Sequence, residues 1–258
     1  MQKNGLSMAE QITKSMNQRI FSVVVLALCV FPIITNAQSE KTWTDHYWNG
    51  PDGIEFHYVE QGEGVPVILL HGFGSSSVRN WFNIGIAQEL AKTNRVIAID
   101  MRGHGDTPRA PEKCKGNMLE DVIALMDYLH IEKAHIGGYS MGGANTIGLL
   151  KLAPERFITA SILGAGVPAS EGWVKSVIRG SVLESDPKLI APIDLSQIKF
   201  PVLAINGEND SAAERQQDFK AVTNLTYVVI PDKIHGNTPR DPAFTVAFAK
   251  FISDNNPN

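Results

Sequence analysis

Residues 134–152 read AHIGGYSMGGANTIGLLKL, and this stretch determines which fold the rest of the chain must complete. It begins with a short apolar run typical of a buried strand and ends with a helical pattern that has small residues in its first turn. Between the two lies Gly138-Tyr139-Ser140-Met141-Gly142. A side chain at the tip of so sharp a turn needs a strained backbone, and the two glycines let neighbouring backbone approach. The pattern predicts an exposed serine between a strand and a helix.

Apolar runs and helical patterns alternate along most of the chain. Runs without polar alternation are typical of strands that are covered on both faces. The alternation of strands and helices therefore predicts an α/β fold with a mostly parallel central sheet and helices on both faces. We expect strands at residues 54–59, 65–70, 95–100, 134–137, 161–166, 200–205 and 225–230, and helices around residues 81–91, 119–129, 143–152 and 242–252.

The composition is that of a globular protein. The chain has 258 residues, of which 43% are hydrophobic and 19% charged, with a formal net charge of −4. This length is sufficient for one α/β domain with a well-buried core. The chain has no basic surplus of the kind that nucleic-acid partners require, so we expect no nucleic-acid partner.

The first 37 residues differ in character from the rest. Three basic residues precede an apolar stretch at residues 20–34, and Thr35-Asn36-Ala37 follows it. This order predicts a secretory signal peptide over residues 1–37 and an exported protein, periplasmic or secreted. The alternative is an uncleaved anchor that holds the domain on the outer side of a membrane. Cleavage leaves Cys114 as the only cysteine, so no internal disulfide is expected.

Polar segments follow two of the predicted strands. Asp210 comes after the strand at 200–205, and His235 comes after the strand at 225–230. Because ligand-binding loops lie at the carboxyl ends of parallel strands, both residues are expected near Ser140. A serine hydroxyl needs a base to remove its proton, a neutral histidine supplies one near pH 7, and a carboxylate orients the imidazole. We therefore predict Ser140, His235 and Asp210 as the catalytic residues.

Alternatives exist for the acidic member of this set. Asp210 also has the position of an N-cap for the residues that follow it, a role compatible with orienting a histidine. Glu208 is a second candidate for the acid. For the base, His235 is the only histidine downstream of Ser140.

A glycine-rich loop follows the strand at 65–70. It reads His71-Gly72-Phe73-Gly74. Acyl transfer passes through an intermediate with a negatively charged oxygen, which backbone N–H groups stabilise. We expect the N–H of Phe73, from this loop, and that of Met141, directly after the serine, to form the oxyanion hole.

With these motifs the chain resembles the α/β-hydrolase superfamily from about residue 54 to its end. Besides G-x-S-x-G and HG-x-G it contains Asp100-Met101-Arg102-Gly103-His104-Gly105, which is similar to the D-x-R-G-x-G turn of that superfamily. The resemblance implies a hydrolase domain over residues 54–258 after a lead at 38–53, and a structural role for Arg102. It also implies a cap, for which only residues 167–199 are available, so we expect a short helical cap that either roofs the acyl pocket or packs on the domain.

These features together predict an exported serine hydrolase that uses no cofactor and no metal. The favoured activity is that of a carboxylesterase acting on a small or medium acyl ester through an acyl-serine intermediate. A lactone, amide or carbon–carbon bond hydrolase of the same fold is the alternative, because the fold hosts many chemistries. A ligand-binding protein without catalytic activity is a further alternative.

Overall fold

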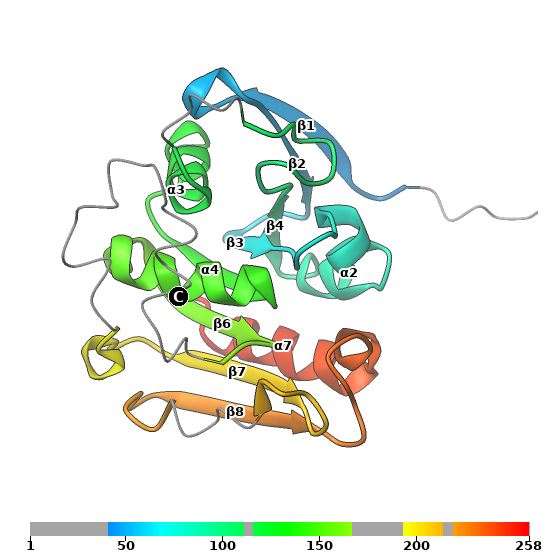
Figure 1. Ribbon diagram of the computed structural model, residues 1–258, viewed down its shortest axis with the longest axis vertical. Helices are drawn as coiled ribbons and strands as arrows, with labels where there is room; N and C mark the ends of the chain where they lie inside the picture. The colour runs from blue at the N-terminus through cyan, green and yellow to red at the C-terminus, as the bar shows by residue number, and fades with distance from the viewer. Residues whose placement is uncertain (1–40, 111–115, 167–192, 214–218, 258) are drawn as a thin grey trace, which may run out of the picture. The chain divides into compact units, whose positions relative to one another are not determined.

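A twisted sheet carries the residues predicted to be functional. The computed structural model describes residues 41–110, 116–166, 193–213 and 219–257. Within these residues the sheet has eight strands. In spatial order they are β1 (Thr44–Asn49), β2 (Glu55–Gln61), β4 (Asn94–Ile99), β3 (Val65–Leu70), β5 (Ala134–Tyr139), β6 (Phe157–Leu163), β7 (Val202–Gly207) and β8 (Leu225–Ile230). Figure 1 labels all of these strands except β5.

The sheet is parallel from β4 to β8. Only the β1–β2 and β2–β4 pairs are antiparallel. The pairs β3–β4, β3–β5, β5–β6, β6–β7 and β7–β8 are parallel, so their carboxyl ends share one edge of the sheet. The predicted fold class, a mostly parallel sheet in an α/β fold, is confirmed.

Helices cover both faces of the sheet. Alternate residues of β3 point to opposite faces, so Ile68 and Leu70 belong to one buried apolar cluster and Val67 and Leu69 to the other. The first cluster lies under α3 (Met118–Tyr128) and α4 (Met141–Leu152), and the second under η2 (Val78–Phe82), α2 (Ile86–Leu90) and α7 (Pro242–Asp254). Short 3-10 turns complete the described elements: η1 (Pro51–Gly53), η3 (Pro154–Arg156), η5 (Leu195–Gln197) and η7 (Thr238–Arg240).

Several elements differ from the expected ones. The lead at residues 38–53 contributes strand β1, which pairs along its whole length with β2. The single helix expected around 81–91 is instead the π-helical turn η2 and the short helix α2, because Gly85 between them has a left-handed backbone with φ +83°. Strand β6 begins at Phe157 and ends before Gly164, whose φ of +56° turns the chain away.

Two predicted segments lie outside the described residues. These are the signal peptide at 1–37 and most of the expected cap, residues 167–192. The remainder of the expected cap belongs to the main domain, because Leu195 and Ile198 are buried in the cluster under α3 and α4. No helix among the described residues is long and apolar enough to cross a membrane. Those residues also contain no group of three or more His, Cys, Asp or Glu side chains placed to hold a metal ion.

Candidate active site

Ser140 occupies the sharp turn between β5 and α4. Its backbone has φ 56° and ψ −111°, a conformation that L-residues rarely adopt and that persists only where the surroundings enforce it. The two motif glycines are required by close backbone approaches. A Cβ on Gly138 would collide with the backbone of Gly142, and one on Gly142 would collide with the carbonyl of Leu70. The turn is therefore packed tightly on its concave side and presents the serine side chain on the other.

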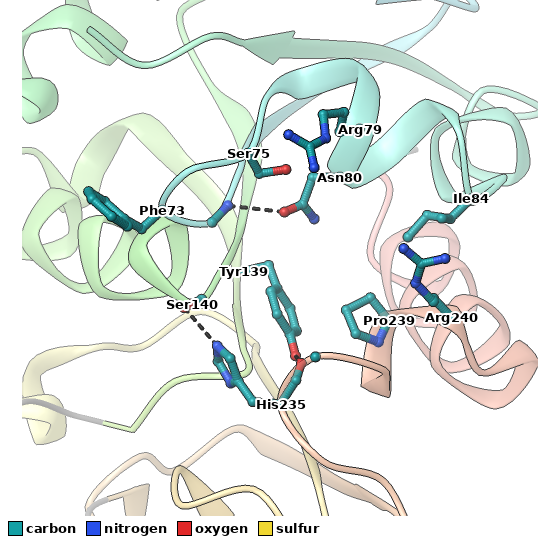
Figure 2. A pocket seen from close by; sticks show the side chains of 12 residues that line it. Phe73, Ser75, Arg79, Asn80, Ile84, Tyr139, Ser140, His235, Pro239 and Arg240 are labelled. Carbon is teal, nitrogen blue, oxygen red and sulfur yellow. Dashed lines mark hydrogen bonds between the residues drawn. The ribbon is translucent and has the colours of Figure 1, made fainter. Parts of the chain in front are cut away.

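The structure brings Ser140, His235 and Asp210 together, although they come from loops after three different strands. His235 Nε2 lies 2.8 Å from Ser140 Oγ, and His235 Nδ1 lies 2.7 Å from Asp210 Oδ2 (Figure 2 shows the first contact). The Asp210 side chain is 1% exposed and that of His235 is 48% exposed. The carboxylate is thus shielded from water, while the imidazole faces the cleft in which a substrate would bind.

The contact between His235 and Asp210 shifts the pKa values of both side chains. The hydrogen bond to Asp210 raises the pKa of His235 above that of an ordinary histidine and outweighs the effect of burial. Burial by itself would raise the pKa of Asp210, but the hydrogen bonds from His235 and from the Ala212 N–H hold this pKa below its ordinary value. Asp210 therefore remains a carboxylate that accepts the Nδ1 proton, which leaves Nε2 of the neutral imidazole free to accept a proton from Ser140.

Of the two candidate acids, Asp210 and Glu208, only Asp210 has a hydrogen bond to His235 among the described contacts. Asp210 Oδ1 accepts a hydrogen bond from the Ala212 N–H at 3.0 Å, so the residue caps the following turn while its other oxygen contacts His235. Glu208 points elsewhere, because its carboxylate accepts from the backbone of Asp232 at 3.0 Å. The two roles expected for Asp210 coexist.

The loop after β3 lies beside Ser140. A Cβ built on Gly72 would be 3.5 Å from the Cβ of Ser140. The Ser75 N–H donates to the Gly72 carbonyl at 3.2 Å, closing a turn in which Gly74 has φ +68°. Phe73 sits at this turn, and Met141 is the first residue of α4, where backbone N–H groups have no acceptor within the helix. The backbone of both residues therefore borders the site, as the oxyanion-hole prediction requires.

A buried network holds this loop in place. Asp100, at the end of β4, accepts from the Ser77 N–H at 2.6 Å, from the Asp106 N–H at 2.9 Å and from His57 Nδ1 at 2.8 Å. His71 Nε2 in turn accepts from the Met101 N–H at 3.0 Å. The D-x-R-G-x-G turn thereby ties the end of β4 to both ends of the loop that carries Phe73.

Arg102, in the same turn, has the structural role expected of it. Its guanidinium binds both oxygens of Asp121 at 2.6 Å and the Gly116 carbonyl at 2.7 Å. The side chain is 10% exposed and that of Asp121 is fully buried. This ion pair fixes the turn to the start of α3 and does not reach the serine.

Tyr139 is a further site residue that motif analysis did not single out. Its hydroxyl donates to the main-chain carbonyl of His235 at 2.5 Å, and the two rings lie 5.2 Å apart. Burial raises the pKa of this phenol, so the hydroxyl stays protonated and remains a donor. The sequence has no local signal for this contact, because the two residues are 96 positions apart.

Two pockets flank the serine, and each is also lined by Phe73 and His235. One has a volume of about 270 Å³ and lies beside η2 and η7. The other has a volume of about 440 Å³ and lies beside the start of α4. Figure 2 shows the first pocket, with side chains that sequence reasoning did not identify, namely Ser75, Arg79, Asn80, Ile84, Pro239 and Arg240. A bound substrate can therefore extend in two directions from the serine hydroxyl.

Comparisons with known proteins agree with this fold. A family model described as the alpha/beta hydrolase fold matches residues 65–173. A solved structure of a meta-cleavage product hydrolase from Pseudomonas fluorescens superposes with a TM-score of 0.66 at 23% identity, covering 81% of this chain and 97% of that one. The chain has the α/β-hydrolase fold.

The curated relatives of this chain are diverse. A 2-hydroxymuconate semialdehyde hydrolase from Pseudomonas putida is 28% identical over 73% of this chain and 75% of its own length. An esterase from Escherichia coli is 37% identical over 37% of each chain. An acetyltransferase component of an acetoin cleaving system from Pseudomonas putida is 42% identical over 54% of this chain. The matched segments span only 34% to 44% of the length of three such relatives.

Proposed function

We propose that this α/β hydrolase is a serine carboxylesterase that cleaves small or medium acyl esters. The observation that carries the proposal is the continuous hydrogen-bonded line from Ser140 Oγ through His235 to Asp210, with distances of 2.8 and 2.7 Å. The first contact is short enough for His235 to remove the proton of Ser140, and the second is short enough for Asp210 to orient the imidazole.

The reaction follows from the placement of these groups. Ser140 Oγ attacks the ester carbonyl as its proton passes to His235 Nε2, and the charged oxygen of the intermediate binds the N–H groups of Phe73 and Met141. The intermediate then expels the alcohol, which takes the proton from His235. Water attacks the acyl-serine with His235 again acting as base, which releases the carboxylic acid and restores the serine.

The sharpest test combines labelling with turnover. A fluorophosphonate probe should label the wild-type protein at Ser140, and Ser140→Ala should lose both labelling and ester hydrolysis. His235→Ala should lose a similar amount of activity, because groups that act as a unit are not additive, and Asp210→Asn should keep a larger residual rate. Full activity of Ser140→Ala, or labelling of another serine, would contradict the assignment.

Carbon–carbon bond hydrolysis is the second candidate. It is supported by the 2-hydroxymuconate semialdehyde hydrolase that aligns over 73% of this chain. The same serine, base and oxyanion donors serve either reaction, so bond preference follows from the pockets. A substrate panel of esters, lactones, amides and 2-hydroxy-6-oxo dienoates, each compared by kcat/KM, decides between them. An acyl burst with an activated ester distinguishes an enzyme from a non-catalytic binding protein.

We also propose that the protein is exported after cleavage of residues 1–37. The proposal is supported by the basic, apolar and small-residue order of that segment. Mass spectrometry of the periplasmic and secreted fractions should show a mature chain that begins near Gln38. An intact N-terminus in the membrane fraction would instead establish an anchored enzyme.

A further inference from the structure

The smaller pocket beside Ser140 contains two guanidinium groups that the reaction steps do not use. Arg79 belongs to η2 and Arg240 to η7, and both side chains line the pocket of about 270 Å³ together with Ser140 and His235. Figure 2 shows them on different walls of the cleft. Segments far apart in the sequence thus each supply one guanidinium group to the lining of the same pocket.

These charges have no counter-ion in the part of the chain that the structure describes. The described lining of the pocket contains neither Asp nor Glu. No ion pair joins either guanidinium to a carboxylate of the described residues. In contrast, Arg95, Arg102 and Arg156 each bind a carboxylate oxygen, at 2.8, 2.6 and 2.8 Å. The two pocket arginines are therefore available to an anionic ligand.

A neutral donor lies on the same wall. Asn80 Oδ1 accepts from the Gly72 N–H at 3.0 Å, which fixes the amide and turns its nitrogen toward the pocket (Figure 2). The pocket on the other side of Ser140 is different, because small and apolar residues dominate its wall: Met141, Ala144, Gly164, Ala165, Gly166 and Ala212. The smaller pocket is therefore lined by two arginine side chains that the larger pocket lacks.

We propose that Arg79 and Arg240 bind a carboxylate group of the substrate, so that the enzyme prefers esters that carry a negative charge. The inference rests on the proposed esterase function and adds the chemical class of the substrate. A planar guanidinium matches a carboxylate with two parallel hydrogen bonds, and arginine is less strongly hydrated than lysine. The ester bond then lies over Ser140, and the apolar part of the molecule occupies the larger pocket.

Matched ester pairs test this preference. The acyl side is probed with 4-nitrophenyl hydrogen glutarate against its methyl ester, and the alcohol side with 4-carboxyphenyl butyrate against its methyl ester. In one of the two pairs the charged ester should have the higher kcat/KM after subtraction of the uncatalysed rate. Arg79→Gln and Arg240→Gln should each lower the ratio of the charged-ester kcat/KM to the neutral-ester kcat/KM about 5-fold, as expected for exposed ion pairs. The preference should weaken at high salt.

Lys92→Gln is the matched control. It makes the same change of charge at an exposed residue just before β4, where the side chain pairs with Glu89 and lines neither pocket. This variant should hydrolyse both esters of each pair like the wild type. The proposal is overturned if neither pair shows a preference for the charged ester, or if the arginine variants slow charged and neutral esters equally.

A binding measurement separates this inference from the esterase proposal. Glutarate is titrated calorimetrically into the wild-type protein and into both arginine variants. If Ser140 is not labelled and no ester is cleaved, the esterase proposal fails. The binding of glutarate then tests the carboxylate site independently. Binding that both variants weaken supports the site, and binding that is absent or unchanged in the variants overturns it.

Discussion

At the scale of single residues, the position of His235, the proposed base, depends on Tyr139. The phenol holds the main chain of His235 through one hydrogen bond and packs against its ring. The same ring fills the space above Gly164, where a Cβ would collide with it. Tyr139 does not touch a substrate carbonyl in the proposed reaction, so we regard it as a positioning residue.

Tyr139→Phe should separate positioning from stability. The change removes the bond to His235 and keeps the ring, so we expect kcat to fall about 10-fold with little change in KM, because small misplacements of a catalytic group are costly. The free energy of unfolding should fall by about 1 kcal/mol. Tyr227→Phe is the control, since it removes a hydroxyl that accepts from Asn206 Nδ2 at 3.0 Å, in a contact that does not involve Ser140 or His235. An equal loss of kcat in both variants would contradict the assignment.

In the proposed reaction, the pH dependence is set by His235. Only its neutral form can accept the Ser140 proton, so activity should be lost as the pH falls through its pKa. Asp210 raises this pKa, so the acidic limb of the kcat/KM profile should have its midpoint above pH 6.5, the ordinary histidine value. In Asp210→Asn the limb should move to lower pH while the maximum rate decreases. A wild-type midpoint at or below pH 6.5 would contradict this prediction.

The same shift has an opposite consequence for stability. A raised pKa means that folding favours the protonated form of His235. This contribution is present below pH 6.5 and is lost as the pH rises through the pKa of the folded state. Activity and this part of the stability therefore change in opposite directions with pH.

At the scale of elements, α4 places the serine because it packs closely against β3. Gly142 lies in its first turn against the backbone of Leu70, and Gly148 lies further along against the side chain of Leu119. A backbone carbonyl cannot move without displacing its strand, whereas the end of a leucine side chain can change position. We therefore expect a methyl group to be tolerated much better at Gly148 than at Gly142.

Alanine at these two glycines tests the packing. Gly142→Ala should lower the free energy of unfolding by about 2 kcal/mol or more and should abolish most esterase activity, since the turn at Ser140 must shift. Gly148→Ala should remain within about 1 kcal/mol of wild type, because the helical preference of alanine offsets the crowding of Leu119. Denaturant melts and kcat/KM are measured for both. Similar behaviour of the two variants would contradict this account.

At the scale of the whole molecule, long-range pairing explains which parts of the fold the sequence predicts. The strands at 65–70 and 225–230 are found at their expected bounds, because an apolar or β-branched run between turn residues needs no partner to be recognised. Strand β1 was not expected, since only Trp48 of its six residues is buried and its extended form depends on pairing with β2.

The candidate site likewise contains residues that the sequence predicts and residues that it does not. The grouping of Ser140, Asp210 and His235 can be predicted, because each follows a strand and has the type of side chain that the proposed reaction needs. Tyr139, Arg79 and Arg240 cannot, because their contribution arises from neighbours that are distant in the sequence. An exposed arginine in a short helical turn has the same local pattern whether it faces solvent or a pocket.

The order of the strands along the chain also has a consequence for protein synthesis. Ser140 follows β5, whereas Asp210 follows β7 and His235 follows β8. A ribosome therefore adds the proposed nucleophile long before the proposed base. A chain that stops before residue 235 contains Ser140 but lacks the imidazole that would remove its proton. In the proposed reaction, a copy released at that stage is chemically silent.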